Sequence, residues 1–149
     1  MPREPALATL RELARCFQAF ESYSSAHIRM LGLTPPQFDI IATLGNTAGM
    51  SFKELGEKTL ITKGTLTGVV DRLEARGIVR RVGSDTDRRS TRVELTDAGA
   101  ALFDKVFPGV VARTKQVFAI LDDTERLALE ASLRRLRESF ESFPRETSK

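Results

Sequence analysis

The sequence has little of the chemistry that metal centres and disulfide frameworks require. Its 149 residues include one cysteine, Cys16, and one histidine, His27, with one tyrosine and no tryptophan. A single cysteine excludes an internal disulfide and any multi-cysteine zinc site. A single histidine removes most metal centres and most histidine-based catalysis. Because the chain also lacks a glycine-rich phosphate loop, we expect no metal, no cofactor and no enzymatic activity.

Long apolar runs are absent as well. No segment approaches the ~18 apolar residues of a membrane span, and the first ten residues lack the apolar core of a signal peptide. The sequence therefore predicts a cytoplasmic protein with no membrane association. Its length and its 41% content of hydrophobic residues fit a single globular domain.

Helical periodicity dominates what is present. Apolar residues recur at helical spacing over about 4–31, 97–121 and 122–143, which predicts three long helices. The first has so narrow an apolar stripe that it needs partner helices to be stable. The second has apolar residues on more than one face, and one stripe is enough for a subunit core. The surplus indicates a contact with a second copy of the chain.

Three shorter helices are predicted in the middle of the chain. Thr34 and Ser51 are each followed, three residues later, by a Gln or Glu that can complete a capping box, so each opens a helix. Thr62 is expected to cap a further helix over residues 63–76, and Gly77 is expected to end it.

A basic hairpin follows these helices. Residues 78–82 and 91–95 alternate in polarity around a polar loop, which predicts two strands. Residues 72–92 carry seven arginines and three acids, in a chain whose net charge is +3. Such a cluster is an electrostatic footprint for phosphate, although a solvated charged face has the same composition. Helix, turn, helix and basic hairpin together predict a winged helix-turn-helix rather than an ordinary three-helix core, and its second helix fits the major groove of B-DNA.

Two glycines interrupt that second helix. Gly64 and Gly68 each lower helix propensity by roughly 1 kcal/mol. Two such residues in one short helix indicate the close approach of another body, either DNA backbone or a packed neighbour.

The order of these pieces resembles the MarR family of transcriptional regulators. The resemblance extends over about residues 7–143, and its last segment has the family's wing pattern, an acid two residues before an arginine, then five residues and Leu-Thr. The segments that carry it are 31–38, 51–56, 62–77 and 87–96.

The resemblance implies a fold and a domain organisation. The expected fold is mostly α-helical with a small β-hairpin wing (α+β), in one domain over residues 1–149. A winged-helix DNA-binding lobe is expected at 34–96. Long terminal helices at 4–33 and 97–143 are expected to form the dimerisation lobe. A two-fold dimer would read a pseudo-palindromic operator whose half-sites lie roughly 34–36 Å apart.

The resemblance also assigns residues to DNA. Arg89 is expected to enter the minor groove, held by an ion pair with Asp87. Side chains near the start of the helix at 63–76 are expected to meet base edges in the major groove. The residues expected at the DNA are Ser51, Lys63, Thr65, Thr67, Arg72, Asp87, Arg88, Arg89 and Arg92.

A small-molecule effector is the third implied partner. An arginine near aromatic side chains suits an aromatic carboxylate or a phenol. The residues expected to line such a pocket are His27, Met30, Phe38, Phe107 and Arg113. A satisfied surface histidine is the plainer interpretation of His27.

These features favour a sequence-specific, homodimeric repressor that is relieved by a small ligand. One alternative is a sequence-tolerant architectural DNA-binding protein without an effector. Another is a redox-sensing repressor that uses Cys16, although Tyr23 is the only tyrosine available to serve such a cysteine. A carrier or interaction module without DNA binding would not need the arginines at 88, 89 and 92.

Overall fold

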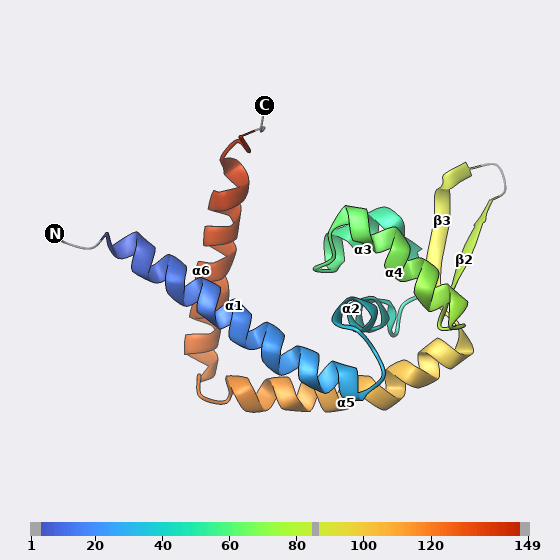
Figure 1. The fold of residues 1–149 in the computed structure, drawn as a ribbon, viewed down its shortest axis with the longest axis horizontal. Coiled ribbons are helices and arrows are strands. Elements are labelled where there is room, and N and C mark those ends of the chain that lie inside the picture. The colour runs from blue at the N-terminus through green and yellow to red at the C-terminus, as the bar shows by residue number, and fades with distance from the viewer. Residues whose placement is uncertain (1–3, 85–86, 147–149) are drawn as a thin grey trace. The chain divides into compact units, whose positions relative to one another are not determined.

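The computed structural model describes residues 4–84 and 87–146, with the backbone alone for residues 84 and 87–90. These residues form six helices and three strands (Figure 1). In chain order the elements are α1 (Pro5–Met30), α2 (Pro35–Leu44), β1 (Met50–Ser51), α3 (Phe52–Lys58), α4 (Lys63–Ala75), β2 (Val79–Ser84), β3 (Asp87–Leu95), α5 (Asp97–Phe118) and α6 (Asp123–Ser142). The chain divides into two compact units, Met1–Phe107 and Pro108–Lys149, so α5 begins in the first unit and ends in the second.

The helix starts follow the capping signals of the sequence. Capping boxes at Thr34 and Ser51 open α2 and α3, as predicted, and a third at Asp122 opens α6. Thr96 caps α5, because its hydroxyl accepts the backbone N–H of Gly99 at 3.0 Å. Each side chain satisfies a backbone N–H that the first turn of a helix leaves unpaired.

Two helix ends depend on glycine in the left-handed conformation. Gly32 follows α1 with φ 78°, and Gly77 follows α4 with φ 73°. An L side chain rarely adopts this conformation, whereas glycine does so without steric cost. Both helices therefore end where the sequence predicts.

The strands form a small antiparallel sheet in the order β1-β3-β2. β2 and β3 form the predicted hairpin and extend further towards its tip than the sequence pattern indicates. β1 was not predicted. It has two residues, and Met50 and Ser51 pair with Val93 and Arg92, so its existence depends on a partner more than forty residues away.

The core of the first unit lies among α2, α3, α4, the sheet and the beginning of α5. Its largest fully buried side chains are Ile40, Ile41, Leu44, Leu55, Leu73, Val70, Val79 and Val93. Two glycines set how closely α5 packs here. A Cβ on Gly45 would clash with the ring of Phe103, and a Cβ on Gly99 would clash with the backbone carbonyl of Ile78. The start of α5 is therefore held tightly against the end of α2 and against the backbone before β2.

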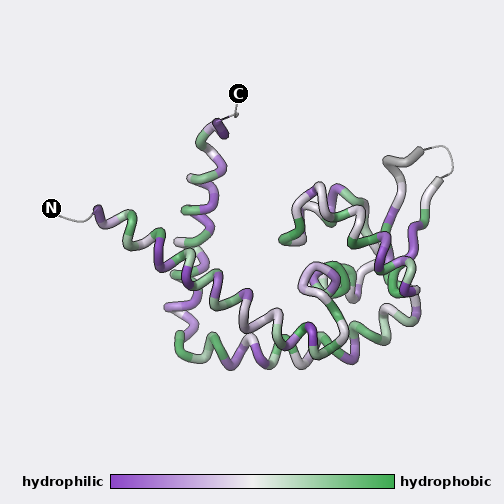
Figure 2. The backbone as a smooth tube through the Cα atoms, viewed as in Figure 1, coloured by the Kyte–Doolittle hydropathy of each residue, from purple (hydrophilic) through white to green (hydrophobic). Residues whose placement is uncertain are grey.

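The long helices leave apolar side chains exposed. Apolar and polar residues alternate turn by turn along α1 and along α6 (Figure 2). Within the single chain, α1 buries only Ile28, and no described residue of α6 is buried. The exposed apolar residues of α1 are Leu7, Leu10, Phe17, Phe20, Tyr23 and Met30, and those of α6 are Leu127, Leu129, Leu133, Leu136 and Phe140. We call these two sets the apolar rows of α1 and of α6.

The second unit departs from the predictions in one boundary. α5 continues past Pro108 and ends at Phe118 rather than near residue 121. Among the described helices, none is both long enough and apolar enough to cross a membrane.

Candidate nucleic-acid interface

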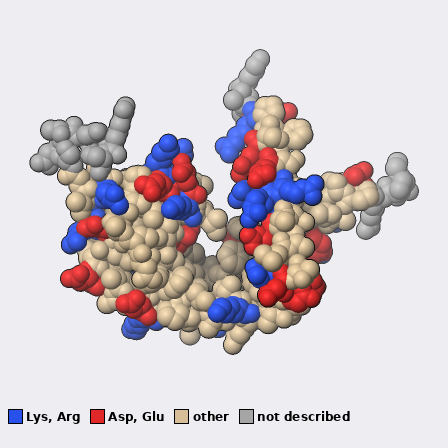
Figure 3. Space-filling model, turned by 180° about the vertical axis from the view of Figure 1, so that it is seen from behind, with Lys and Arg blue, Asp and Glu red and all other residues tan. Residues whose placement is uncertain are grey.

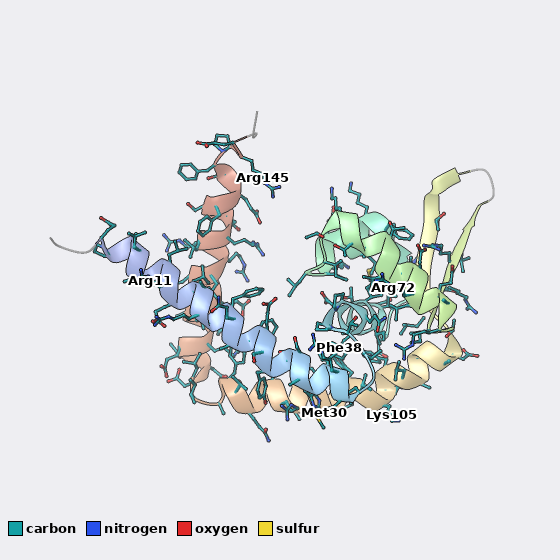
Figure 4. The ribbon with its side chains drawn as sticks, viewed as in Figure 1. Arg11, Met30, Phe38, Arg72, Lys105 and Arg145 are labelled. Atoms are coloured by element: carbon teal, nitrogen blue, oxygen red, sulfur yellow. The ribbon has the colours of Figure 1, made fainter. Side chains whose placement is uncertain are left out.

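α4 presents one apolar face and one exposed face. Its inward side chains are those that the periodicity predicts, namely Leu66, Val69, Val70 and Leu73. At 3.6 residues per turn, Gly64 and Gly68 fall near the middle of the opposite face, and Thr67 and Arg72 fall on its two flanks. Lys63, Thr65, Thr67 and Arg72 are all exposed, and Figure 4 labels Arg72 on this helix. The predicted base-reading side chains therefore share the side of α4 that the core does not use.

The two glycines leave the middle of this exposed face without side chains. A Cβ built on Gly64 or on Gly68 would meet no described atom within 4 Å. Among the described residues, no neighbour in the same chain accounts for the missing side chains. The close approach of a second molecule, such as DNA, to this face stays a prediction.

Thr62 differs from its prediction. It occupies the N-cap position of α4, but its side chain makes no capping hydrogen bond to the backbone. Its hydroxyl instead pairs with the hydroxyl of Thr65. The sequence around Thr62 resembles that around the other caps. Here, however, the hydroxyl of Thr65, three residues later, competes with the backbone for the Thr62 side chain. The first turn of α4 consequently lacks the side-chain cap that stabilises the other helix starts.

Ser51 and Arg92 lie opposite each other in the β1–β3 pairing. The Ser51 hydroxyl accepts the backbone N–H of Glu54 at 3.1 Å and donates to its carboxylate at 3.3 Å. The Arg92 guanidinium donates to the carbonyl of Gly49 at 2.7 Å. Ser51 thus caps α3, Arg92 holds the turn before β1, and the predicted contacts of both with DNA stay predictions.

The arginine cluster contains residues with structural tasks. Arg80 lies 2.6 Å from Glu94 on the neighbouring strand. Arg81 binds both Asp71 and Glu74 of α4, and the hydrogen bond to Asp71 is the largest of the effects that raise the pKa of Arg81. On the face shown in Figure 3, basic and acidic side chains are interspersed rather than gathered into one patch. The phosphate footprint is therefore smaller than seven arginines suggest.

The wing tip carries the remaining predicted contacts. Asp87, Arg88 and Arg89 form the beginning of β3, and Asp87 pairs with Ser84 across the hairpin. The side chains of these three residues lie outside what the structure describes. The ion pair between Asp87 and Arg89 and the entry of Arg89 into the minor groove therefore stay predictions.

The five candidate ligand-binding residues are distributed over both units. Phe38 and Phe107 pack against the core of the first unit, and Phe107 stacks on Phe103 with ring centroids 4.6 Å apart. His27 is half-buried on α1, whereas Met30 is 85% exposed at the end of that helix (Figure 4). Arg113 belongs to the second unit, so a pocket shared by all five stays a prediction.

Two side chains that hold α4 in place were not assigned this role from the sequence, in which Arg76 counts only as part of the arginine cluster. Arg76, the C-cap of α4, donates to the carbonyl of Gly32 and to the side chain of Gln37, both at 3.2 Å. Asp39 of α2 accepts the backbone N–H of Leu60, in the turn before α4, at 2.7 Å. For the contact of Asp39 with Leu60, the only signal in the sequence is a carboxylate that stands between the apolar residues Phe38 and Ile40.

Known proteins are similar to this chain in the region of the helix-turn-helix and the hairpin. A model of the MarR family matches residues 31–90. MhqR, an HTH-type transcriptional regulator of Bacillus subtilis, is 30% identical over 122 residues, which are 82% of this chain and 84% of MhqR. The transcriptional repressor NicR of Pseudomonas putida is 34% identical over 110 residues, 74% of this chain and 70% of NicR.

A solved structure agrees over nearly the whole chain. BpsR of Bordetella bronchiseptica superimposes with a TM-score of 0.78 at 28% identity, covering 92% of this chain and 98% of that one. BpsR is described as a protein whose DNA binding is regulated by 6-hydroxynicotinic acid.

Proposed function

This chain belongs to the MarR family of transcriptional regulators, and we propose that it is a homodimeric repressor that binds a pseudo-palindromic operator and releases it when a small aromatic ligand binds. The observation that carries the proposal is the exposed face of α4, which has polar flanks and a glycine centre and stands next to an arginine-bearing hairpin. Such a regulator acts on DNA in the cytoplasm.

The DNA contacts divide into two kinds. Lys63, Thr67 and Arg72 on α4 meet base edges and phosphates in the major groove, because an exposed helix of this width fits there. Arg89 at the wing enters the adjacent minor groove, where the negative potential of A·T-rich sequence attracts a guanidinium. Phosphate contacts supply affinity and register, whereas base contacts supply specificity.

The dimer is supported by the apolar rows of α1 and of α6. Exposed apolar rows of this length are rare on a monomer, since each large side chain left in water forgoes roughly 1.5–3 kcal/mol of burial. A second copy supplies the same rows in a two-fold arrangement. Two copies of α4 then present themselves to two half-sites.

Release by a ligand follows from linkage. A ligand that binds preferentially to a dimer whose reading helices are wrongly spaced lowers DNA affinity by that preference. The DNA binding of BpsR is described as regulated by 6-hydroxynicotinic acid, and this supports an aromatic acid as the class of ligand. His27, Met30, Phe38, Phe107 and Arg113 are the residues proposed to bind it.

The test is footprinting of the purified protein on fragmented genomic DNA. A few protected pseudo-palindromes are expected, and Arg89→Ala should weaken them by about 1–3 kcal/mol. Arg11→Ala, which removes the same charge from α1, serves as the matched control and should leave the footprints unchanged. Diffuse, salt-sensitive protection that Arg89→Ala does not alter would instead support the architectural alternative.

The effector is tested on the same footprints. Hydroxylated aromatic carboxylates, with 6-hydroxynicotinic acid as the first probe, should abolish protection without dissociating the dimer. The redox alternative predicts a different result, in which organic peroxide abolishes protection by the wild type but not by Cys16→Ser. Cys16 is exposed in the single chain.

A further inference from the structure

α4 begins differently from the other helices. Among the helices of the described ranges, it alone starts without a capping side chain that accepts a backbone N–H of its first turn. In the turn before it, Leu60 is 82% exposed, whereas Ile61 packs against the core. Beyond this packing, the turn is held by hydrogen bonds to the neighbouring helices.

Asp39 supplies a bond to this turn from outside it. Its carboxylate, on α2, accepts the backbone N–H of Leu60 at 2.7 Å across 21 residues of sequence. Leu60 lies two residues before Thr62, the N-cap of α4. On the other side of Leu60, the hydroxyl of the buried Thr59 donates to the carbonyl of Leu55 in α3 at 2.6 Å. The turn is thus held between α2 and α3.

The far end of α4 is tied to the same helix. Arg76 donates to the side-chain oxygen of Gln37, which also completes the capping box of α2. Gln37 and Asp39 are two residues apart, and Gln37 contacts the C-cap of α4 whereas Asp39 contacts the turn before its first residue. Figure 1 shows α2 beside α3 and α4 in this lobe, so α2 provides a frame for the placement of α4.

From this geometry we infer that Asp39 is a positioning residue for sequence-specific DNA binding. By accepting the Leu60 N–H it fixes the turn that sets where α4 begins, and hence where Lys63 and Thr67 stand. The inference rests on the proposed function, because it concerns how well α4 discriminates among DNA sequences.

The sign of the charge effect separates this role from simple electrostatics. Asp39 is a negative group in a lobe proposed to bind phosphate, so its removal should tighten all DNA binding if charge alone mattered. A positioning role predicts the opposite for the operator, because the first turn of α4 loses its anchor. Non-specific DNA requires no such alignment and should not weaken.

The experiment compares two variants that carry the same charge. Asp39→Ala removes both the charge and the acceptor, and Asp39→Asn removes the charge but keeps an oxygen that can accept the Leu60 N–H. Asp104→Ala is the control, because it removes an exposed carboxylate of α5. Affinities are measured for an operator found by footprinting and for a scrambled duplex, with thermal unfolding of each variant as a check on folding.

Asp39→Ala should weaken operator binding about tenfold and leave binding to the scrambled duplex unchanged or tighter. Asp39→Asn should stay within about twofold of wild type for both duplexes. If both variants keep wild-type discrimination, or both lose it equally, the inference is overturned. A wild type that does not discriminate between the duplexes would refute the proposed function itself.

Amide hydrogen exchange of the DNA-free protein tests the anchor directly. Exchange of the Leu60 amide and of the first turn of α4 should be faster in Asp39→Ala than in Asp39→Asn, whereas α5 should exchange alike in both. Equal exchange at Leu60 in the two variants would overturn the positioning role without bearing on the proposed repressor function.

Discussion

Arg81 of β2 lies 3.0 Å from Glu74 of α4, and its guanidinium also binds Asp71, about one turn earlier on that helix. The same group lies over the ring of Phe52 of α3, 5.5 Å from the centroid. One side chain therefore joins the base of the wing to both helices of the helix-turn-helix. An arginine that looked from the sequence like a phosphate ligand is an internal brace.

Replacement of this brace should cost stability. Arg81→Ala is expected to lower the free energy of unfolding by about 1 kcal/mol, since two partly exposed ion pairs and one cation–π contact are lost. Arg72→Ala removes an exposed arginine of α4 and should leave stability unchanged while weakening DNA binding. Urea unfolding and operator affinity, measured side by side, check both variants. Equal unfolding midpoints for Arg81→Ala and wild type would contradict the brace.

Replacing a glycine of α4 with alanine should raise the stability of the protein and lower its affinity for the operator. Gly68→Ala is expected to stabilise the protein by up to roughly 1 kcal/mol, because alanine favours the helix and its Cβ meets no described atom. The added methyl group should nevertheless weaken operator binding, because it raises the face that approaches DNA. Gly99→Ala is the contrasting variant and should destabilise, because its Cβ clashes with the Ile78 carbonyl. Tighter operator binding by Gly68→Ala would argue against close approach at this position.

The second unit offers a test of the dimer. Val117 is 48% exposed near the end of α5, and Val117→Asp would place a charge in the proposed apolar contact. Analytical ultracentrifugation should show weaker association, because an unpaired charge is costly to desolvate. Gln116→Asp, at the neighbouring exposed position, introduces the same charge and should associate normally. An unchanged mass and melting temperature for Val117→Asp would show that this face is free.

Asp39 gives stability a pH dependence with a defined sign. Burial raises the pKa of Asp39 above its ordinary value of 3.8, and the hydrogen bond from Leu60 offsets only part of this effect. The folded chain therefore holds this proton more tightly than the unfolded chain, so Asp39 lowers stability as pH rises from 3.8 through the folded pKa. Asp39→Asn should resist urea better than wild type near neutral pH, and the advantage should shrink as pH falls towards 3.8. A constant difference between the two proteins across this range would contradict the burial of a charge.

Local signals were the ones that could be predicted from the sequence. The caps at Thr34, Ser51, Thr96 and Asp122 involve partners three residues away, so the sequence around each of them contains the whole interaction. The inward face of α4 was predictable for the same reason, since periodicity alone determines which side is apolar.

Contacts between distant segments could not be predicted in this way. Nothing near Asp39 in the sequence indicates that it meets the Leu60 amide, and nothing near Arg81 distinguishes it from an arginine that faces DNA. β1 exists only because Met50 meets Val93 in the folded lobe. Such pairings depend on the tertiary arrangement, which brings a donor and an acceptor together from separate elements.

The apolar rows of α1 and of α6 have a genetic consequence. If these rows pair two copies as proposed, a cell that makes equal amounts of the normal chain and of Arg89→Ala would assemble mixed dimers in which only one wing can read its half-site. With random pairing, about half of the normal chains would then be in defective pairs, so the wing allele should be dominant in a merodiploid strain. Val117→Asp should be recessive, because a chain that cannot pair leaves the normal product alone.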